Sequence, residues 1–160
     1  NDCNIDGVRI FGGTGWYPKT SQVILHWRFP DLRMIKINQN PNLPLYNSVA
    51  DWIESEHKKF INNINESDET YDVVVSHHIP DRDLVSEYFK DSEVNDFFAS
   101  NVYRNVINKP RNWLYGHTHW AGDCEIDETR FVCNPFGYPH ELGVNGFNPN
   151  KTIELEVSNG

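Results

Sequence analysis

The apolar positions of this chain fall into short runs that polar and turn residues separate. Two of the runs, at 72–76 and 113–115, are almost continuous, which is typical of strands buried on both faces of a parallel sheet. The segment 8–12 follows an Asp-Gly turn and predicts another strand. Weaker or alternating patterns predict a hairpin from 124–126 and 130–133, a strand at 152–157, and weak strands or irregular segments at 23–27 and 34–37.

A helix is predicted to begin at Ser48, because Ser48-Val-Ala-Asp51 resembles a capping box. The polar run 62–70 ends it. Since this helix would lie between the strands 8–12 and 72–76, it predicts the crossover that joins parallel strands. The face expected to pack on the sheet consists of Val49, Trp52, Ile53, Phe60 and Ile64.

A second, shorter helix is predicted from Ser100 to Ile107, with Ser100 as its cap and Pro110 beyond its end. Its buried side is expected to carry Val102, Tyr103, Val106 and Ile107. Strands that alternate with helices predict an α/β fold. At 160 residues the chain is expected to form a single domain, 1–160, with a core of its own.

Composition narrows the classes of function. The net charge is −9 and the 14 Lys and Arg residues are scattered, which excludes a strongly basic surface for nucleic acid. No apolar run approaches the roughly 20 residues of a membrane span. Cys124 and Cys133 could face each other across the hairpin, but an odd count of three favours free thiols and a cytoplasmic, reducing setting. A start at Asn1 is typical of an interior point of a longer polypeptide.

The candidate chemistry lies where the two buried runs end. His77 and His78 follow the run 72–76, and Gly116-His117-Thr118-His119 follows the run 113–115. Parallel strands bring their carboxyl ends to the same edge of a sheet, and neutral imidazole is the commonest metal ligand. These histidines are therefore predicted to bind metal, although the plain alternative is a chance His-x-His pair among seven histidines.

Other polar residues have weaker claims. His26 is expected to be a partly buried side chain, and the glycines at 12–15 a turn that is too short for a phosphate loop. The charged segment 81–92 leaves the strand at the histidine end. Its Asp81, Arg82 and Asp83 are candidates for touching a ligand, with a solvated loop as the simpler interpretation.

Three motifs together resemble the calcineurin-like metallophosphoesterase family. They are Val-Val-Val-Ser-His77-His78-Ile-Pro80, Leu-Tyr-Gly116-His117-Thr118-His119, and Asn134-Pro135-Phe136-Gly137-Tyr138. The match covers about the last three-fifths of such a domain. The three earlier motifs of the family, Asp-x-His, Gly-Asp-x-x-Asp and Gly-Asn-His-Asp/Glu, do not occur in this chain.

The resemblance implies the C-terminal part of a four-layer αββα sandwich. It also implies two divalent transition-metal ions (Mn, Fe, Zn or Ni) whose bridging hydroxide attacks the phosphorus of a phosphoester. His77 and His117 would bind one metal and His119 the other, while His78 would contact the phosphorylated substrate; whether His77 or His78 is the ligand stays open. No residue of this chain has an implied role in proton transfer.

The bridging Asp and the remaining ligands would come from the same polypeptide or from a partner chain, so the 160-residue chain alone is expected to be inactive. The alternative is an inactive binding or structural module. There the histidines would hold one zinc, with Cys124 or Cys133 as fourth ligand, or none. A metal-independent hydrolase has little support, because no Gly-x-Ser-x-Gly elbow occurs and Ser76 and His77 are too close in sequence.

Overall fold

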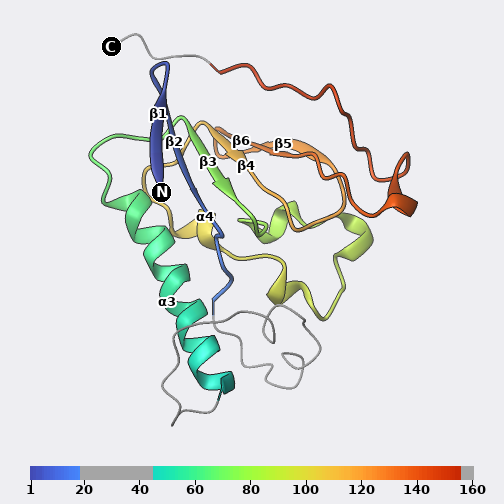
Figure 1. Ribbon diagram of the computed structural model, residues 1–160, viewed down its shortest axis with the longest axis horizontal. Helices are drawn as coiled ribbons and strands as arrows, with labels where there is room; N and C mark the ends of the chain where they lie inside the picture. Colours follow the sequence, from blue (N-terminus) through green and yellow to red (C-terminus); the bar gives the residue numbers. More distant parts are fainter. Residues whose placement is uncertain (19–44, 156–160) are drawn as a thin grey trace.

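The computed structural model describes residues 1–18 and 45–155, and the side chains of these except for residues 45–48. Its centre is one mixed sheet with the strand order β1-β2-β3-β4-β6-β5 (Figure 1). The predicted runs 23–27 and 34–37, and His26, lie outside the described residues. The strands are β1 (Asp2–Ile5), β2 (Val8–Gly13), β3 (Val73–Ser76), β4 (Asn112–Leu114), β5 (Gly122–Ile126) and β6 (Thr129–Cys133).

The four inner strands of the sheet, β2, β3, β4 and β6, run parallel, and an antiparallel strand closes each edge. The predicted strands at 8–12, 72–76 and 113–115 and the predicted hairpin are confirmed to within a residue or two. The edge strand β1 was not predicted, because its residues Asp2–Ile5 are all exposed and show no apolar pattern.

The crossover between β2 and β3 contains the long helix α3 (Leu45–Asn65), as predicted. The helix begins three residues before Ser48, so the predicted start was wrong. Serine only mildly disfavours a helix interior, and a capping signature does not prevent helix upstream of it. The predicted face is buried, with Val49, Ile53, Phe60 and Ile64 buried and Trp52 half-buried, but only part of it packs on the sheet. Phe60 and Ile64 pack with strand residues, whereas Val49 and Ile53 pack with Tyr17 and Phe97 outside the sheet.

The second helix, α4 (Val102–Asn105), is shorter than predicted at both ends. Asn101 precedes it, whereas the hydroxyl of Ser100 donates to the Ile79 carbonyl at 3.3 Å. A bridge between Ile79 and Ala99 holds the chain extended up to that point, which keeps Ser100 from capping. Ile107 is 78% exposed and was wrongly placed in the core.

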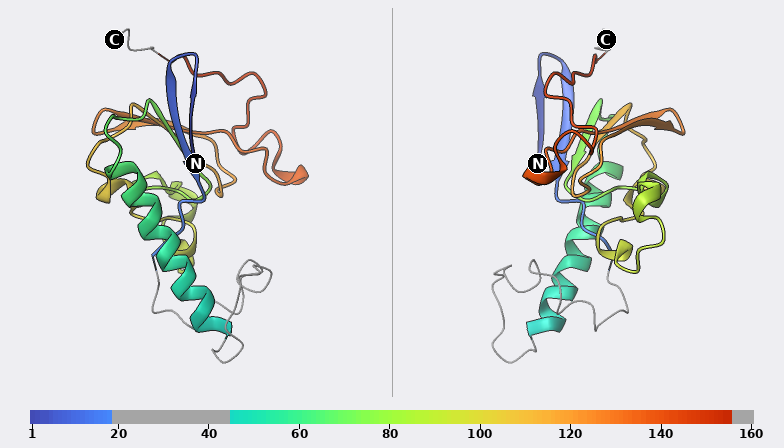
Figure 2. Two further views of the ribbon diagram at one scale, coloured as in Figure 1. Left: turned by 60° about the vertical axis from the view of Figure 1, so that its left-hand side comes forward. Right: turned by 90° about the vertical axis from the view of Figure 1, so that its right-hand side faces the viewer.

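The core lies between α3 and the parallel strands (Figure 2). Phe60 of α3 packs on Phe11 of β2, with ring centroids 5.1 Å apart, and on Trp113 of β4, at 6.3 Å. Trp113 and Phe131 have no exposed surface. The described residues thus form an α/β fold with a single sheet; the second sheet of a four-layer sandwich stays a prediction.

The remaining described segments are mostly irregular and contain short turns of 3-10 helix. The segment predicted to be a loop at 81–92 contains η1 (Arg82–Leu84) and η2 (Glu87–Phe89), followed by η3 (Asn95–Phe97), and η4 (Pro139–Glu141) lies in the C-terminal segment. Residues 152–155 do not form the predicted strand. Without a partner strand, alternating polarity alone does not hold an extended segment in a sheet.

Two expectations from composition can be compared with the structure. All three cysteines are free thiols, and the register pairs Cys124 with Phe131 and Cys133 with Gly122, so the two cysteines do not face each other. Among the described residues, no helix has the length and apolar character that crossing a membrane requires.

Candidate functional site

Two of the predicted metal ligands stand side by side at adjacent strand ends. His77 follows β3, and His117 follows β4 after Tyr115 and Gly116. The pairing of the two strands continues beyond their last residues, because the Gly116 amide donates to the His77 carbonyl at 3.1 Å. The parallel topology therefore brings together two histidines that are 40 residues apart.

The side chains of these two histidines point at each other. Nε2 of His77 lies 3.0 Å from Nδ1 of His117, and the rings are inclined at 60°. His117 has a φ of +64°, the left-handed region that costs a non-glycine residue about 1–2 kcal/mol. Backbone strain of this kind clusters at functional sites, so its presence at His117 suggests function.

The distance of 3.0 Å can be compared with the spacing of two ligands on one ion. A metal–imidazole bond is about 2.0–2.1 Å long, so two nitrogens on one ion lie about 2.9 Å apart at a right angle and about 3.4 Å apart at the tetrahedral angle. The observed value falls in this interval. It also suits an N–H···N hydrogen bond between two neutral rings. The distance is compatible with either arrangement, and metal binding by His77 and His117 stays a prediction.

His78, the predicted substrate contact, lies in a different environment. Only 1% of its surface is exposed, and its ring packs against those of His117 and Trp16, with centroids 4.6 and 4.8 Å away. Burial, reinforced by the nearby His117, lowers the pKa of His78 to about 3. His78 is therefore neutral at pH 7, and its contact with substrate stays a prediction.

A loop that the sequence presented only as a glycine-rich turn holds the histidines in place. The carbonyl of Thr14 accepts the backbone amides of His77 and His78, each at 3.1 Å, and lies 3.2 Å from Nδ1 of His78. The loop passes close to its neighbours because Gly15 has a φ of +62° and a Cβ there would meet the Cβ of Ser76 at 2.8 Å. The role of this loop is structural: the Thr14 carbonyl acts as a clamp on the backbone of His77 and His78.

Three further hydrogen bonds support this arrangement, and one of them involves His57, which the sequence did not single out. Nδ1 of His57, a buried residue of α3, lies 2.6 Å from the Trp16 carbonyl and ties the loop to the helix. The hydroxyl of Ser76 donates to the His78 carbonyl at 2.8 Å and accepts from Nε1 of Trp113 at 2.9 Å. Ser76 thus has a structural role, which agrees with the weak support for a serine hydrolase.

His119, the third predicted ligand, is bound to a residue that the sequence did not single out. Its Nδ1 lies 2.8 Å from Oε2 of Glu141, at the end of η4, and its ring packs on Tyr138 with centroids 4.5 Å apart. The amide of Tyr138 donates to the same Oε2 at 2.5 Å, and this bond lowers the pKa of Glu141. A histidine that donates one N–H to a carboxylate is oriented to offer its other nitrogen as a ligand.

These donors do not yet make a complete metal centre. No group of three or more His, Cys, Asp or Glu side chains within 1–18 and 49–155 is arranged to hold a metal ion. The cysteines of the single-zinc alternative do not join the histidines in such a group. Burial raises the pKa of Cys133 to about 12 and also raises that of Cys124, which disfavours the thiolates that zinc needs.

The charged residues after Pro80 serve the fold. Asp81 is buried, accepts the Asp83 amide at 3.0 Å through Oδ1, and pairs through Oδ2 with Nε of Arg104 at 2.5 Å. Asp83 pairs with the same guanidinium at 2.8 Å, and Arg82 forms an ion pair with Asp96. These contacts order the start of the segment around the buried Asp81. Arg82, Asp83 and residues 87–91 are exposed, which agrees with the solvated-loop interpretation.

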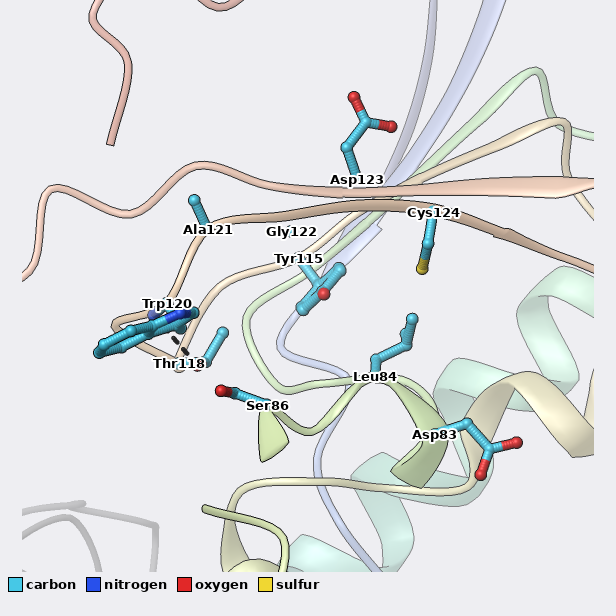
Figure 3. A pocket seen from close by; sticks show the side chains of 10 residues that line it. All are labelled: Asp83, Leu84, Ser86, Tyr115, Thr118, Trp120, Ala121, Gly122, Asp123 and Cys124. Atoms are coloured by element: carbon cyan, nitrogen blue, oxygen red, sulfur yellow. Dashed lines mark hydrogen bonds between the residues drawn. The ribbon is translucent and has the colours of Figure 1, made fainter. Parts of the chain in front are cut away.

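A pocket of about 190 Å³ opens beside residues 115–121, which carry His117 and His119 and are called the histidine loop below (Figure 3). It lies between the segment 83–86 and β5. The sequence contained no signal for it, because its walls come from two stretches of chain, 83–86 and 115–124, that only the fold brings together. The lining residues are Asp83, Leu84, Ser86, Tyr115, Thr118, Trp120, Ala121, Gly122, Asp123 and Cys124.

Comparison with known proteins gives few relatives. No protein-family model matches the chain. The chain is 24% identical over 163 residues to the uncharacterized protein L509 of Acanthamoeba polyphaga mimivirus; the match covers 95% of this chain and 57% of that protein. Among solved structures, the phosphopantetheinyl hydrolase (PptH) of Mycobacterium tuberculosis is similar with a TM-score of 0.46 and 12% identity, covering 88% of this chain and 54% of that one. The chain therefore spans little more than half the length of each, and a likeness of this degree assigns no activity.

Proposed function

We propose that this chain supplies the histidine ligands of a dinuclear metal site that hydrolyses a phosphoester. The observation that carries the proposal is the 3.0 Å separation of Nε2 of His77 and Nδ1 of His117 at the ends of adjacent parallel strands. The motifs that resemble calcineurin-like metallophosphoesterases support it. In this proposal the chain forms the C-terminal part of a four-layer sandwich.

Each histidine has its own part in the proposed site. His77 and His117 would hold one divalent ion (Mn, Fe, Zn or Ni), and His119, oriented by Glu141, would hold the second. Two such ions neutralise the phosphoryl oxygens and supply hydroxide at neutral pH. The neutral, buried ring of His78 supports the ligand pair without adding positive charge to it.

The proposal requires carboxylates from outside this chain. Neutral imidazoles do little to offset the repulsion between two close dications, and the described residues contain no cluster that would do so. The missing ligands would come from further residues of the same polypeptide or from a partner chain. By itself, the 160-residue chain is expected to have little or no activity.

The test uses a longer polypeptide that includes the residues encoded upstream of Asn1. After reconstitution with Mn²⁺ or Zn²⁺, we expect elemental analysis to find two ions per chain and the protein to hydrolyse bis(p-nitrophenyl) phosphate. His117→Ala should abolish hydrolysis and metal uptake while leaving the circular dichroism spectrum unchanged. His140→Ala, an exposed histidine beside Glu141, is the matched control and should retain both. Wild-type turnover by His117→Ala would refute the assignment.

The incomplete ligand set also favours a second candidate, an inactive binding module that keeps the sheet and binds at most one metal. The absence of a three-ligand group from the described part of the chain is the observation behind it. The same experiment separates the two functions. A longer polypeptide that is folded, takes up no more than one ion and hydrolyses nothing would favour the module.

A further inference from the structure

The pocket beside the histidine loop has the size of a single ring. Its volume of about 190 Å³ is slightly larger than the roughly 150 Å³ of an apolar cavity that accepts benzene. Figure 3 shows it between Leu84 and Ser86 on one side and Tyr115 and Cys124 on the other.

The lining favours an uncharged group. Leu84, Tyr115, Trp120 and Ala121 contribute apolar surface, and no Lys or Arg is among the lining residues. The two acidic residues of the lining do not make it anionic inside. In Figure 3 the carboxylates of Asp83 and Asp123 point away from the pocket, and they pair with Arg104 and Arg130 at 2.8 and 2.9 Å. A phosphate group would find no positive charge there.

The aromatic wall of the pocket is held in place. The Trp120 ring stacks on Tyr88, with centroids 5.7 Å apart and planes inclined by 5°. The Trp120 amide donates to the hydroxyl of Thr118 at 3.3 Å. Gly122 leaves room for Tyr115, since a Cβ at Gly122 would lie 3.1 Å from the Tyr115 hydroxyl. Aromatic rings in this position offer a planar ligand stacking and edge contacts.

The pocket and the histidines share one loop. Tyr115, Thr118 and Trp120 line the pocket, and His117 and His119 alternate with them along the chain. A ligand that reached from the histidines to the pocket would have an anionic end and an uncharged, planar end. From this we infer that the pocket binds an uncharged aromatic or heteroaromatic ring of the substrate, while the phosphate of the same molecule lies at His77 and His117. The assignment of the phosphate rests on the proposed function.

Alkylation of the cysteines tests the pocket without any reaction at the histidines. Cys124 lines the pocket and is exposed, Cys3 is exposed on β1 outside it, and Cys133 is buried. Benzyl alcohol, a neutral aromatic probe, is expected to slow the reaction of Cys124 with iodoacetamide several-fold at saturation. The rate at Cys3 should not change, and inorganic phosphate should protect neither. Equal rates at Cys124 with and without benzyl alcohol would overturn the inference.

Two variants locate the binding. Trp120→Ala removes the aromatic wall and is expected to abolish the protection of Cys124, whereas Phe136→Ala, which removes an exposed ring outside the pocket, should keep it. Gly122→Ala is a milder change that narrows the pocket through Tyr115 and should weaken the protection of Cys124. It provides a second test in case Trp120→Ala does not fold. Full protection in both Trp120→Ala and Gly122→Ala would place the probe elsewhere.

Hydrolysis by the longer polypeptide provides an independent arm. Benzyl and methyl phosphate have leaving groups of similar basicity, so a preference of about tenfold or more in kcat/KM for the benzyl ester would report ring binding, and Trp120→Ala should remove it. If neither ester is hydrolysed but benzyl alcohol protects Cys124, the proposed function fails and the ring pocket stands. If both esters are hydrolysed equally and Cys124 is unprotected, the proposed function stands and the inference about the ring pocket fails.

Discussion

Oε2 of Glu141 lies 2.8 Å from Nδ1 of His119, although 22 residues separate them in the chain. The same oxygen accepts the Tyr138 amide, and the pKa of Glu141 is held below its ordinary value by that bond and by His119. Glu141 is therefore ionised at neutral pH and directs the proton of His119 to Nδ1. The contact orients the His119 ring so that Nε2 is the nitrogen facing away from Glu141, which is the arrangement of histidine ligands in metal sites.

Glu141→Gln is expected to weaken metal binding by about 10–100-fold in the longer polypeptide, because the amide keeps the shape but loses the charge that orients His119. Competition with a chromophoric zinc chelator measures the affinity. Glu125→Gln makes the same change at an exposed glutamate on β5 and should have no effect. An unchanged affinity in Glu141→Gln would show that His119 does not depend on this carboxylate.

His117→Gly is expected to be more stable than His117→Ala, by up to about 1 kcal/mol. Both variants lack the imidazole, so their difference isolates the backbone. The φ of +64° at His117 is strained for alanine and accessible to glycine. Urea denaturation of the two variants of the 160-residue chain gives the difference in unfolding free energy. A more stable alanine variant would mean that residue 117 does not adopt the left-handed conformation.

Stability of the metal-free chain is expected to fall in acid because of His78. Its pKa is about 3 in the folded chain, owing first to burial, and about 6.5 when unfolded. The unfolded chain thus binds an extra proton between these values. The contribution of His78 is complete above about pH 6.5 and is lost as the pH falls toward 3, with a slope of up to about 1.4 kcal/mol per pH unit.

Urea denaturation at a series of pH values measures this slope. His78→Phe, which cannot be protonated, should show a smaller pH dependence between pH 6.5 and 4, whatever its absolute stability. The carboxylates of the chain contribute equally in both proteins and cancel in the comparison. Identical slopes in the two proteins would contradict the burial of a neutral imidazole at this position.

Asp81→Ala is expected to destabilise the chain by about 2 kcal/mol, and Asp83→Ala by less than about 0.5 kcal/mol. The Asp81 side chain is 3% exposed and both caps η1 and pairs with Arg104, whereas that of Asp83 is 72% exposed. The neighbouring substitution is the control for local charge. Small, similar effects of both changes would show that the contacts of Asp81 do not stabilise the fold, as expected for a side chain in a solvated loop.

Local patterns predicted much of the fold. The spacing of Val49, Ile53, Phe60 and Ile64 identified the buried face of α3, because helical periodicity is a property of neighbouring residues. Runs of apolar residues identified β3 and β4, because burial on both faces of a strand is also visible in neighbouring residues. The edge strand β1 was not predicted, since it is exposed and pairs only with β2. The helix start at Ser48 was misplaced because capping signals act locally and yield to the rest of the fold.

In the candidate site, too, some features could be predicted from local sequence and others could not. The placement of His77 and His117 at strand ends could be predicted, since both follow apolar runs directly. The partner of His119 could not, because Glu141 belongs to an irregular segment with no periodic pattern. The same holds for the clamp formed by Thr14 and for the role of Asp81, whose charges suggested solvent exposure but lie against Arg104.

By itself, the sequence determined which residues form the inner strands and the long helix, and which histidines stand at the strand ends. These features depend on side-chain spacing over a few residues, and so they can be read along the chain. Only the tertiary structure decided that His77 meets His117, that Glu141 orients His119, and that a ring-sized pocket opens beside them. Such contacts join segments that are tens of residues apart, and their geometry arises only when the strands pair and the loops pack.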